Sequence, residues 1–496
     1  MLLSLLFTLE NLFVIIFGVL VGLVVGAIPG LGAAIAIALL VPVTFSLSPV
    51  AAILLLVTVY QASEYGNSVT AILMGVPGTP AAVPTIMDGN TMAKQGFPGK
   101  ALGYSMTGSL VGGVVGVLAL MFLAKPISSF AMGFSDPEMF LISVLALLCV
   151  GSLGTKDLPK SIISILLGLL VSTIGLDTLT GQSRFTFGSI HLMDGLSAIA
   201  LLIGMFAIAE VLNMVSTDLN KKYVTDIKNL KTGITWKEFT DVKKYIVRSS
   251  VIGTFIGILP GLGASAASWF AYMDAKRSSK NPENFGKGEP GGIVAPDAAN
   301  NAAVGGALVP LLSLGIPGSA TMAIVLSAFL IHGIQPGPRI FETNFDLIAA
   351  IFWGFLGATI LSYFFGRYTT SIMARMLMIP NYRLAPGILF ISLIGAYAAH
   401  GNEFDLWIVL IAGIITFVLI KLDFAPAVFV LALIFGPMSE EYFRRSLMLS
   451  QGDYSVFYTS IYSIVLIILI LIVIGFSIRR TWNERAAGSS DVKDHL

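Results

Sequence analysis

The chain has little charge and almost no cysteine. Only 11% of its 496 residues are Asp, Glu, Lys or Arg, against about 25% in an average soluble protein. The single cysteine, Cys149, excludes a disulfide within the chain and is expected to fill space in an apolar run. The four histidines are scattered without metal-ligand spacing. These shortages exclude an ordinary soluble domain and a disulfide-stapled fold.

Sequence motifs for nucleotide hydrolysis and for common hydrolases are also absent. No Walker A, HExxH or GxSxG phrase occurs, so the chain is not expected to hydrolyse ATP or to be an enzyme. An intramembrane enzyme would need a nucleophile and a base, and no convincing pair is found. The net charge of +1 gives no reason to expect nucleic acid as a partner.

Apolar runs of membrane-spanning length recur along the whole chain. Hydrophobic residues make up 56% of the sequence, and the mean hydropathy is +0.88. A run of about 20 apolar residues is long enough to cross a bilayer as a helix. The sequence therefore predicts an all-α polytopic membrane protein with about 10–12 transmembrane helices.

Two phrases occur twice and predict two homologous repeats. GAIPGLGAA at 26–34 matches GILPGLGAS at 257–265, and GVPGT at 75–79 matches GIPGS at 315–319. The first prolines are 231 residues apart, whereas Gly66 and Gly306, like Pro77 and Pro317, are 240 apart. The predicted domains are a first membrane repeat (1–215), a linker (216–245), a second repeat (246–480) and a polar tail (481–496).

Lysine-rich segments predict which parts face the cytoplasm. The linker and the C-terminus are expected there, and so is the basic loop 274–292. Both ends of 246–273 then lie on one side, so the central Pro-Gly break predicts a re-entrant hairpin, with a sister hairpin over 12–45. The alternative is one long kinked helix. Repeats with an odd number of spans would be inverted, and we favour inverted over parallel repeats.

Each PGLG turn ends one helix and starts another. The second helix presents free backbone N–H groups and a positive dipole end, which together can hold an anion. Broken helices at equivalent places in two halves are typical of transporter substrate sites; the alternative is a packing kink. The substrate-site residues predicted here are Pro29, Gly30, Gly32, Gly261 and Gly263.

A second pair of breaks is followed by hydroxyl residues. Ser or Thr at such a position can cap a helix or bind a carboxylate, and an ordinary capped loop is the alternative. The residues predicted to bind substrate here are Gly78, Thr79, Gly318, Ser319 and Thr321.

Polar side chains precede these second breaks inside otherwise apolar segments. Buried amides and carboxylates are costly in a membrane and need partners. Asn67, Ser68, Asn300 and Asn301 are predicted to bind substrate, although helix capping could also explain Asn300. Ser63, Glu64 and Asp297 are the candidates for ion coupling, and no metal is expected beyond a Na⁺ ion.

These phrases together resemble the large permease subunit of the tripartite tricarboxylate transporters. The matching wording includes YGNSVTAILMGVPGTPAA, APDAANNAAVGGALVPLLSLGIPGSATMA and GIQPGP, within residues 26–102 and 253–339. Asn67 stands where the family often has glycine, and Asp297 where it often has glutamate.

The resemblance implies a secondary active importer of di- or tricarboxylates such as citrate, coupled to Na⁺ or H⁺ and without another cofactor. It implies two partners, a small membrane subunit and an extracytoplasmic solute-binding protein. The implied location is the inner membrane of a prokaryote. Two alternatives remain: a carboxylate or ion channel, and a non-transporting scaffold subunit.

Overall fold

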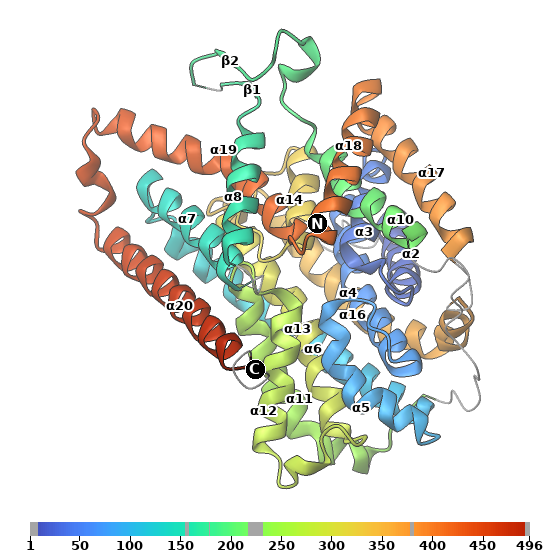
Figure 1. The fold of residues 1–496 in the computed structure, drawn as a ribbon. Helices are drawn as coiled ribbons and strands as arrows, with labels where there is room; N and C mark the ends of the chain where they lie inside the picture. The colour runs from blue at the N-terminus through green and yellow to red at the C-terminus, as the bar shows by residue number, and fades with distance from the viewer. Residues whose placement is uncertain (1–7, 154–157, 178, 217–231, 377–380, 492–496) are drawn as a thin grey trace. The chain divides into compact units, whose positions relative to one another are not determined.

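The computed structural model describes residues 8–153, 158–177, 179–216, 232–376 and 381–491 (Figure 1). Helices dominate this part of the chain, which confirms the predicted all-α membrane class. Seven of its helices are long and apolar enough to cross a bilayer, and four more apolar helices are 10–17 residues long. The expected total of 10–12 spans and the repeats themselves stay predictions.

The chain folds as two compact units. The first contains residues 1–129 and 199–417, and the second contains 130–198 and 418–496. The predicted repeats follow the sequence instead, and their boundaries at 1–215 and 246–480 are a separate prediction. Most of the predicted linker, residues 217–231, and the end of the tail, 492–496, lie outside the described residues.

Two buried helices form the centre of the first unit. They are α4 (Pro49–Met74) and α13 (Pro290–Leu314), and nearly every residue of both is buried. Each begins with proline in its first turn, where the missing N–H costs no hydrogen bond. Each ends at a left-handed glycine, Gly75 with φ 66° and Gly315 with φ 73°. The two central helices therefore start and stop by the same local rules.

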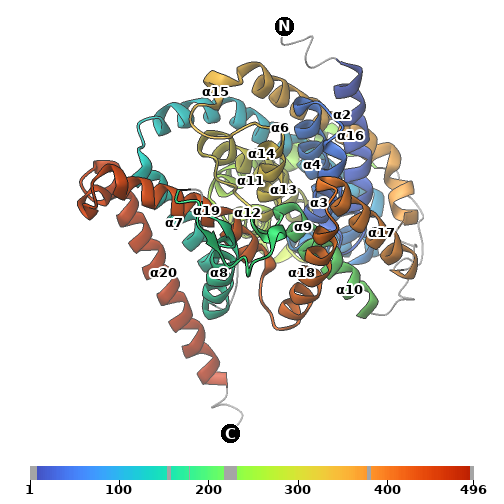
Figure 2. The same cartoon turned by 90° about the horizontal axis from the view of Figure 1, so that it is seen from above.

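A helical pair packs against each central helix. The pair α2 (Leu9–Gly26) and α3 (Gly32–Thr44) contacts α4, and the pair α11 (Trp236–Ile258) and α12 (Gly263–Ser278) contacts α13. Figure 2 shows α2 next to α4, and Figure 1 shows α11 and α12 near α13. A side chain at Gly22 would meet Val59 at 2.6 Å, and one at Gly257 would meet Ala303 at 2.5 Å. Glycine lets these backbones touch, as is common between membrane helices.

Polar contacts join the two helices of each pair at a distance from the turn. Arg248 of α11 binds Asp274 of α12 at 2.6 Å, and Glu10 of α2 accepts two hydrogen bonds of 2.8 Å from Ser48, just beyond α3. In both pairs the partners lie at nearly equal distances along the chain from the PGLG turn. Two helices that meet this way run back along each other, so the geometry is that of a hairpin and not of one kinked helix.

The remaining elements of the first unit surround this centre. They are η1 (Pro80–Ala82), α5 (Val83–Lys94), α6 (Pro98–Ala131), α9 (Ala198–Leu202), the π-helix η3 (Ile203–Ile208), α10 (Ala209–Ser216), η4 (Pro282–Asn284), α14 (Ala320–Ile331), α15 (Ile340–Thr343), α16 (Phe345–Met376), α17 (Asn381–His400) and α18 (Glu403–Lys421).

The second unit is a smaller helical group that also contains a short pair of β-strands. Its elements are α7 (Asp136–Leu153), α8 (Leu158–Ser172), η2 (Ile190–Leu192), α19 (Pro426–Leu449), η5 (Tyr454–Phe457) and α20 (Ile461–Asp491). The strands β1 (Gly175–Leu176) and β2 (Ser183–Arg184) pair antiparallel after α8. α19 packs on both α7 and α8, and α20 packs on α7.

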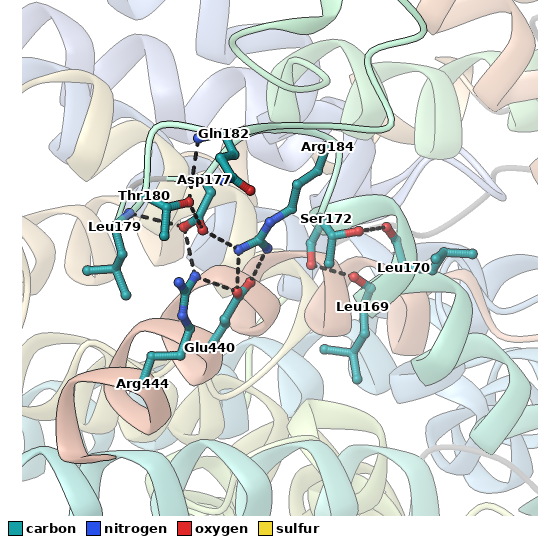
Figure 3. Close-up of polar contacts among 11 residues, drawn as sticks. Leu169, Leu170, Ser172, Asp177, Leu179, Thr180, Gln182, Arg184, Glu440 and Arg444 are labelled. Carbon is teal, nitrogen blue, oxygen red and sulfur yellow. Dashed lines mark hydrogen bonds and ion pairs between the residues drawn. The ribbon is translucent and has the colours of Figure 1, made fainter. Parts of the chain in front are cut away.

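A closed ring of four charged side chains joins this strand pair to α19 (Figure 3). Arg184 binds Asp177 at 2.8 Å and Glu440 at 2.8 Å, and Arg444 binds the same two acids at 2.7 and 3.0 Å. Each charge in the ring has two partners of opposite sign. The strands thus depend on side chains of α19 as well as on their own short ladder.

Candidate functional site

The two central helices meet through polar side chains and run in opposite directions. Gln61 of α4 donates to Asn301 of α13 at 3.0 Å, and Ser68, further along α4, donates to Asp297, earlier on α13, at 2.9 Å. The 240 residues between Gln61 and Asn301 equal the offset between the matched glycines and prolines. The contact between these two residues is therefore a contact between equivalent positions of the predicted repeats.

The direction of the hairpins follows from the same contacts. Gly18, Gly22 and Gly26 approach successive residues of α4, so α2 and α4 are parallel, and Gly253 and Gly257 show the same for α11 and α13. Because α4 and α13 are antiparallel, the two hairpins also point in opposite directions. This arrangement supports inverted repeats, as transporters of this architecture use them.

Two carboxyl groups lie within this interface. Asp297 is fully buried, and its Oδ1 accepts hydrogen bonds from Ser68 at 2.9 Å and from Thr85 at 2.6 Å. Glu64 is 4% exposed and lies within 3.4 Å of the Asn67 amide, with Asn300 beside it. Neither acid forms a salt bridge with any residue that the structure describes. Acids buried in a membrane without a basic partner usually have a function.

Several buried polar atoms of this cluster have no hydrogen-bond partner among the described residues. They are Gln61 Oε1, Asn67 Oδ1, Ser105 Oγ, Asp297 Oδ2 and both amide atoms of Asn300. Ser105 nevertheless lies next to the Asp297 carboxyl, and the Asn300 amide lies next to the Glu64 carboxyl. An unpaired buried polar group costs about 1–3 kcal/mol. A ligand, an ion or water would satisfy these atoms.

In the first predicted repeat, the helix break at 75–79 lies against the PGLG turn at 29–32. Asn67 donates to Thr79 at 3.1 Å, and a side chain at Gly32 would meet the Thr79 methyl group at 2.9 Å. Gly30 and Gly32 have φ of 87° and 48°, so the turn uses left-handed backbone that glycine adopts readily. The first turn of α3 has no side-chain cap. No side-chain oxygen therefore accepts from the first N–H groups of α3.

In the second predicted repeat, the PGLG turn at 260–263 is hydrogen-bonded directly to the helix break at 315–319. The Gly261 N–H donates to the Gly318 carbonyl at 3.0 Å, and a side chain at Gly263 would lie 3.6 Å from Ser319. Ser319 caps α14 through Met322 N at 3.2 Å and lies 3.5 Å from the Tyr60 hydroxyl. The start of α12 has no side-chain cap. Ser319 therefore caps α14, which was the alternative explanation for this residue, and it also lies at the site.

The structure brings most of the predicted residues into one region of the first unit. Asn67, Ser68, Thr79, Asn300 and Asn301 take part in the contacts above, and Thr321 lies near the Tyr60 hydroxyl. Gly78 contacts Asn67 and the Gly26 carbonyl, and Gly318 contacts the Gly257 carbonyl. Pro29 lies in the turn after α2.

Ser63 differs, since it donates to the Tyr60 carbonyl of its own helix at 2.9 Å. The roles of all these residues stay predictions.

Sequence reasoning missed four members of the site. Gln61, Thr85 and Ser105 bind or adjoin the predicted residues, and the Glu210 carboxylate lies against Gly30 of the first turn. The spacing of 240 residues from Asn301 is a signal that could have identified Gln61. Glu210 was visible as an acid in an apolar run, but nothing in the sequence connects it with the turn.

Asp88 of α5 binds the loop that precedes α13. Its Oδ1 accepts backbone N–H groups of Gly286, Gly288 and Glu289 at 2.7–2.9 Å, and its Oδ2 accepts from Tyr272 at 3.0 Å. Three N–H groups around one oxygen form a nest for an anion. The Asp88 carboxylate already fills this nest, so it is a structural joint between α5 and the loop.

The charged ring of the second unit is not a comparable site. A cavity beside it is lined by Ser172, Thr173, Asp177, Arg184, Glu440 and Arg444 among others. The two arginines and two acids neutralise one another, so no unpaired charge is left for a ligand.

Comparison with known proteins identifies the family. The model of the tripartite tricarboxylate transporter TctA family matches residues 12–431. The chain belongs to this family. This TctA-family chain is therefore a multi-pass membrane subunit of a transporter. TctA is the large subunit of a tripartite system, which implies further subunits.

Two relatives of this TctA-family chain occur in Agrobacterium vitis. An uncharacterised 52.8 kDa protein of the TAR-I ttuC' 3' region is 36% identical over 448 residues, which cover 89% of this chain and 88% of the relative. An uncharacterised protein of the TAR-II ttuC' 3' region is 37% identical over 212 residues, which cover 42% of this chain and 86% of the relative. No solved structure matches the chain.

Proposed function

We propose that this chain is the permease subunit of a secondary active importer that takes up carboxylates such as citrate. An ion gradient drives the import, and an extracytoplasmic solute-binding protein delivers the substrate. The observation that carries the proposal is the buried polar cluster between two antiparallel helices, next to four helix breaks, with unpaired donors and acceptors in it. Family membership supports a tricarboxylate as substrate.

The cluster contains the groups that a carboxylate needs. The first turns of α3 and α12 supply uncapped N–H groups, and Thr79, Ser319 and Thr321 supply hydroxyls. The Asn300 amide nitrogen is a further buried donor, next to the Glu64 carboxyl. The substrate would bind through backbone and neutral donors, which hold an anion without an arginine or lysine.

The two acids provide the physical basis for coupling. Glu64 and Asp297 would repel a carboxylate substrate if both stayed charged and uncompensated. A Na⁺ ion or a proton that binds with the substrate removes this repulsion, so that the two bind cooperatively. Movement of one helical group against the other around the site would then expose it to either side in turn.

Uptake of labelled citrate into proteoliposomes tests this function. The permease is reconstituted with its small membrane subunit, and the solute-binding protein is added outside. Saturable uptake is expected that depends on an imposed Na⁺ or proton gradient. Uptake without saturation or gradient dependence would indicate a channel instead, and no uptake by any combination would indicate a scaffold.

The variant Asn301→Ala tests the position of the site. Asn301 links Gln61 to the Asp297 carbonyl, so its loss should reduce the initial rate of citrate uptake at least tenfold. Ser392→Ala is the matched control, since Ser392 is equally buried but bonds only within α17. Equal kinetics of wild type and Asn301→Ala would remove Asn301 from the site.

A further inference from the structure

We infer that residues 173–197, which we call the docking segment, form the surface on which the extracytoplasmic solute-binding protein binds. This inference rests on the proposed function, and it names the docking surface and the chemistry of the partner's matching face. That face would offer apolar pockets for Phe185, Phe187 and Ile190, surrounded by basic side chains.

The docking segment lies on the extracytoplasmic side of the second unit. α19 is long and apolar enough to cross a bilayer, and α8 runs parallel to it, because Lys160 binds Asp423 at 3.9 Å near their starts and the charged ring joins their ends. Lys156, Lys160 and Lys421 lie near these starts, which are therefore cytoplasmic. The docking segment follows the end of α8, and Figure 1 shows β1 and β2 beyond that end.

Three large apolar side chains of the docking segment are exposed. Phe187 is 90% exposed, Ile190 80% and Phe185 54%. They follow Arg184 of the charged ring in sequence, so they belong to the same irregular segment beyond α8 and not to a helix face that lipid would cover. Exposed apolar side chains that occur together indicate an interaction site.

The backbone presents two of these side chains in an unfavourable conformation. Phe185 and Phe187 have φ of 51° and 50°, in the left-handed region, which costs a residue with a side chain about 1–2 kcal/mol. Such a conformation persists only where surrounding bonds impose it. Here the Leu176 N–H donates to the Met193 carbonyl at 2.8 Å across the segment, and the charged ring holds β2. A surface fixed in this way loses little conformational entropy when a partner binds.

The local charge favours a soluble protein over a lipid surface as the partner. Arg445 binds Asp136 at 3.3 Å, so the start of α7 lies at the same end of the unit as the end of α19. Residues 132–138, 173–197 and 437–460 together contain seven acids, three arginines and no lysine. Segments that lie in a membrane surface are typically rich in Lys and Arg, and anionic lipids would repel a net negative charge. A protein face with a basic rim would instead be attracted and oriented.

Binding of the purified solute-binding protein to the full-length permease in nanodiscs tests the inference without transport. Phe187→Ser and Ile190→Ser should each weaken binding at least tenfold, because they remove apolar anchors. Asp194→Lys should slow association in low salt, and this difference should shrink as KCl is added. In proteoliposomes, Phe187→Ser should raise the concentration of binding protein that gives half-maximal uptake at least tenfold and leave the maximal rate unchanged.

Phe97→Ser is the matched control. Phe97 is also an exposed phenylalanine, at 57%, but it lies beside Lys94 and Lys100 in the turn between α5 and α6, which is expected to be cytoplasmic. This variant should bind as the wild type does, and unchanged melting midpoints should show that all variants fold.

A polarity-sensitive fluorophore on Phe187→Cys, in a Cys149→Ser background, separates the two kinds of partner. Its emission should shift to the blue when the solute-binding protein is added. Emission that is already blue-shifted in nanodiscs alone and does not respond would show that lipid covers the segment, and would overturn the inference.

The inference is also wrong if the wild type does not bind the solute-binding protein, or if Phe187→Ser and Ile190→Ser bind it as the wild type does. Gradient-driven uptake together with unchanged binding by these variants would refute the inference and leave the proposed function standing. Binding that the variants weaken, without any uptake, would do the reverse.

Discussion

Asp177 is the most heavily bonded acid of the second unit. It accepts from Arg444, Thr180, the Leu179 N–H and Arg184, and only 6% of its side chain is exposed. These bonds, with Arg444 first, hold the pKa of its carboxyl well below the usual range. A group whose pKa is lower in the folded state stabilises the fold above its unfolded pKa of about 3.9. This contribution is lost as the pH falls through the folded pKa.

Asp177→Asn should therefore lower the melting midpoint at pH 7 by a few degrees. The difference from the wild type should shrink steadily below about pH 4, because the carboxyl of the unfolded wild type then binds a proton that folding must release. Thermal unfolding of both proteins between pH 7 and pH 3 measures this. A difference that stays constant with pH would show that charge at residue 177 does not matter.

Single residues also show what the sequence could and could not predict about the site. Asn300 and Asn301 stood out because amides are rare in apolar helices. Ser105 did not, since small hydroxyl residues are common in membrane helices and bond their own backbone there. Its importance comes from the contact of α6 with α13, which no local pattern encodes.

At the scale of elements, the hairpins were predictable and their packing was not. Proline and glycine mark the turns at Pro29 and Pro260, and the basic loop after the second turn requires the chain to return. The sequence does not state which helix each hairpin covers. That depends on glycines such as Gly257, whose role is visible only beside Ala303.

Gly257→Ala should separate α11 from α13 and destabilise the permease. The added methyl group would lie 2.5 Å from the Ala303 carbonyl oxygen, and overpacking of this kind costs about 1–3 kcal/mol. Gly357→Ala on α16 is the control, since its methyl group would meet nothing within 4 Å. Melting curves should show a lower midpoint only for Gly257→Ala. Equal midpoints would mean that the two helices can shift apart without loss.

At the scale of the whole molecule, inverted hairpins predict opposite sidedness. The open end of the α11–α12 hairpin adjoins the basic loop and should be cytoplasmic, so the open end of the α2–α3 hairpin should be extracytoplasmic. In a Cys149→Ser background, Ser46→Cys should react with an impermeant thiol reagent added to intact cells. Lys280→Cys should react only after the membrane is opened. Labelling of both from one side would contradict inverted repeats.

The contact between Gln61 and Asn301 has a consequence for the origin of the chain. Equivalent positions of the two predicted repeats would touch only on the axis that relates the repeats. A half-length ancestor could build this centre only by pairing with a second copy inserted upside down, and both copies would then carry the same residue on the axis. Fusion into one gene removes that restriction. The position equivalent to Glu64 is Val304, and the position equivalent to Asp297 is Val57. Duplication of the predicted repeat would thus let a symmetric scaffold acquire an asymmetric centre.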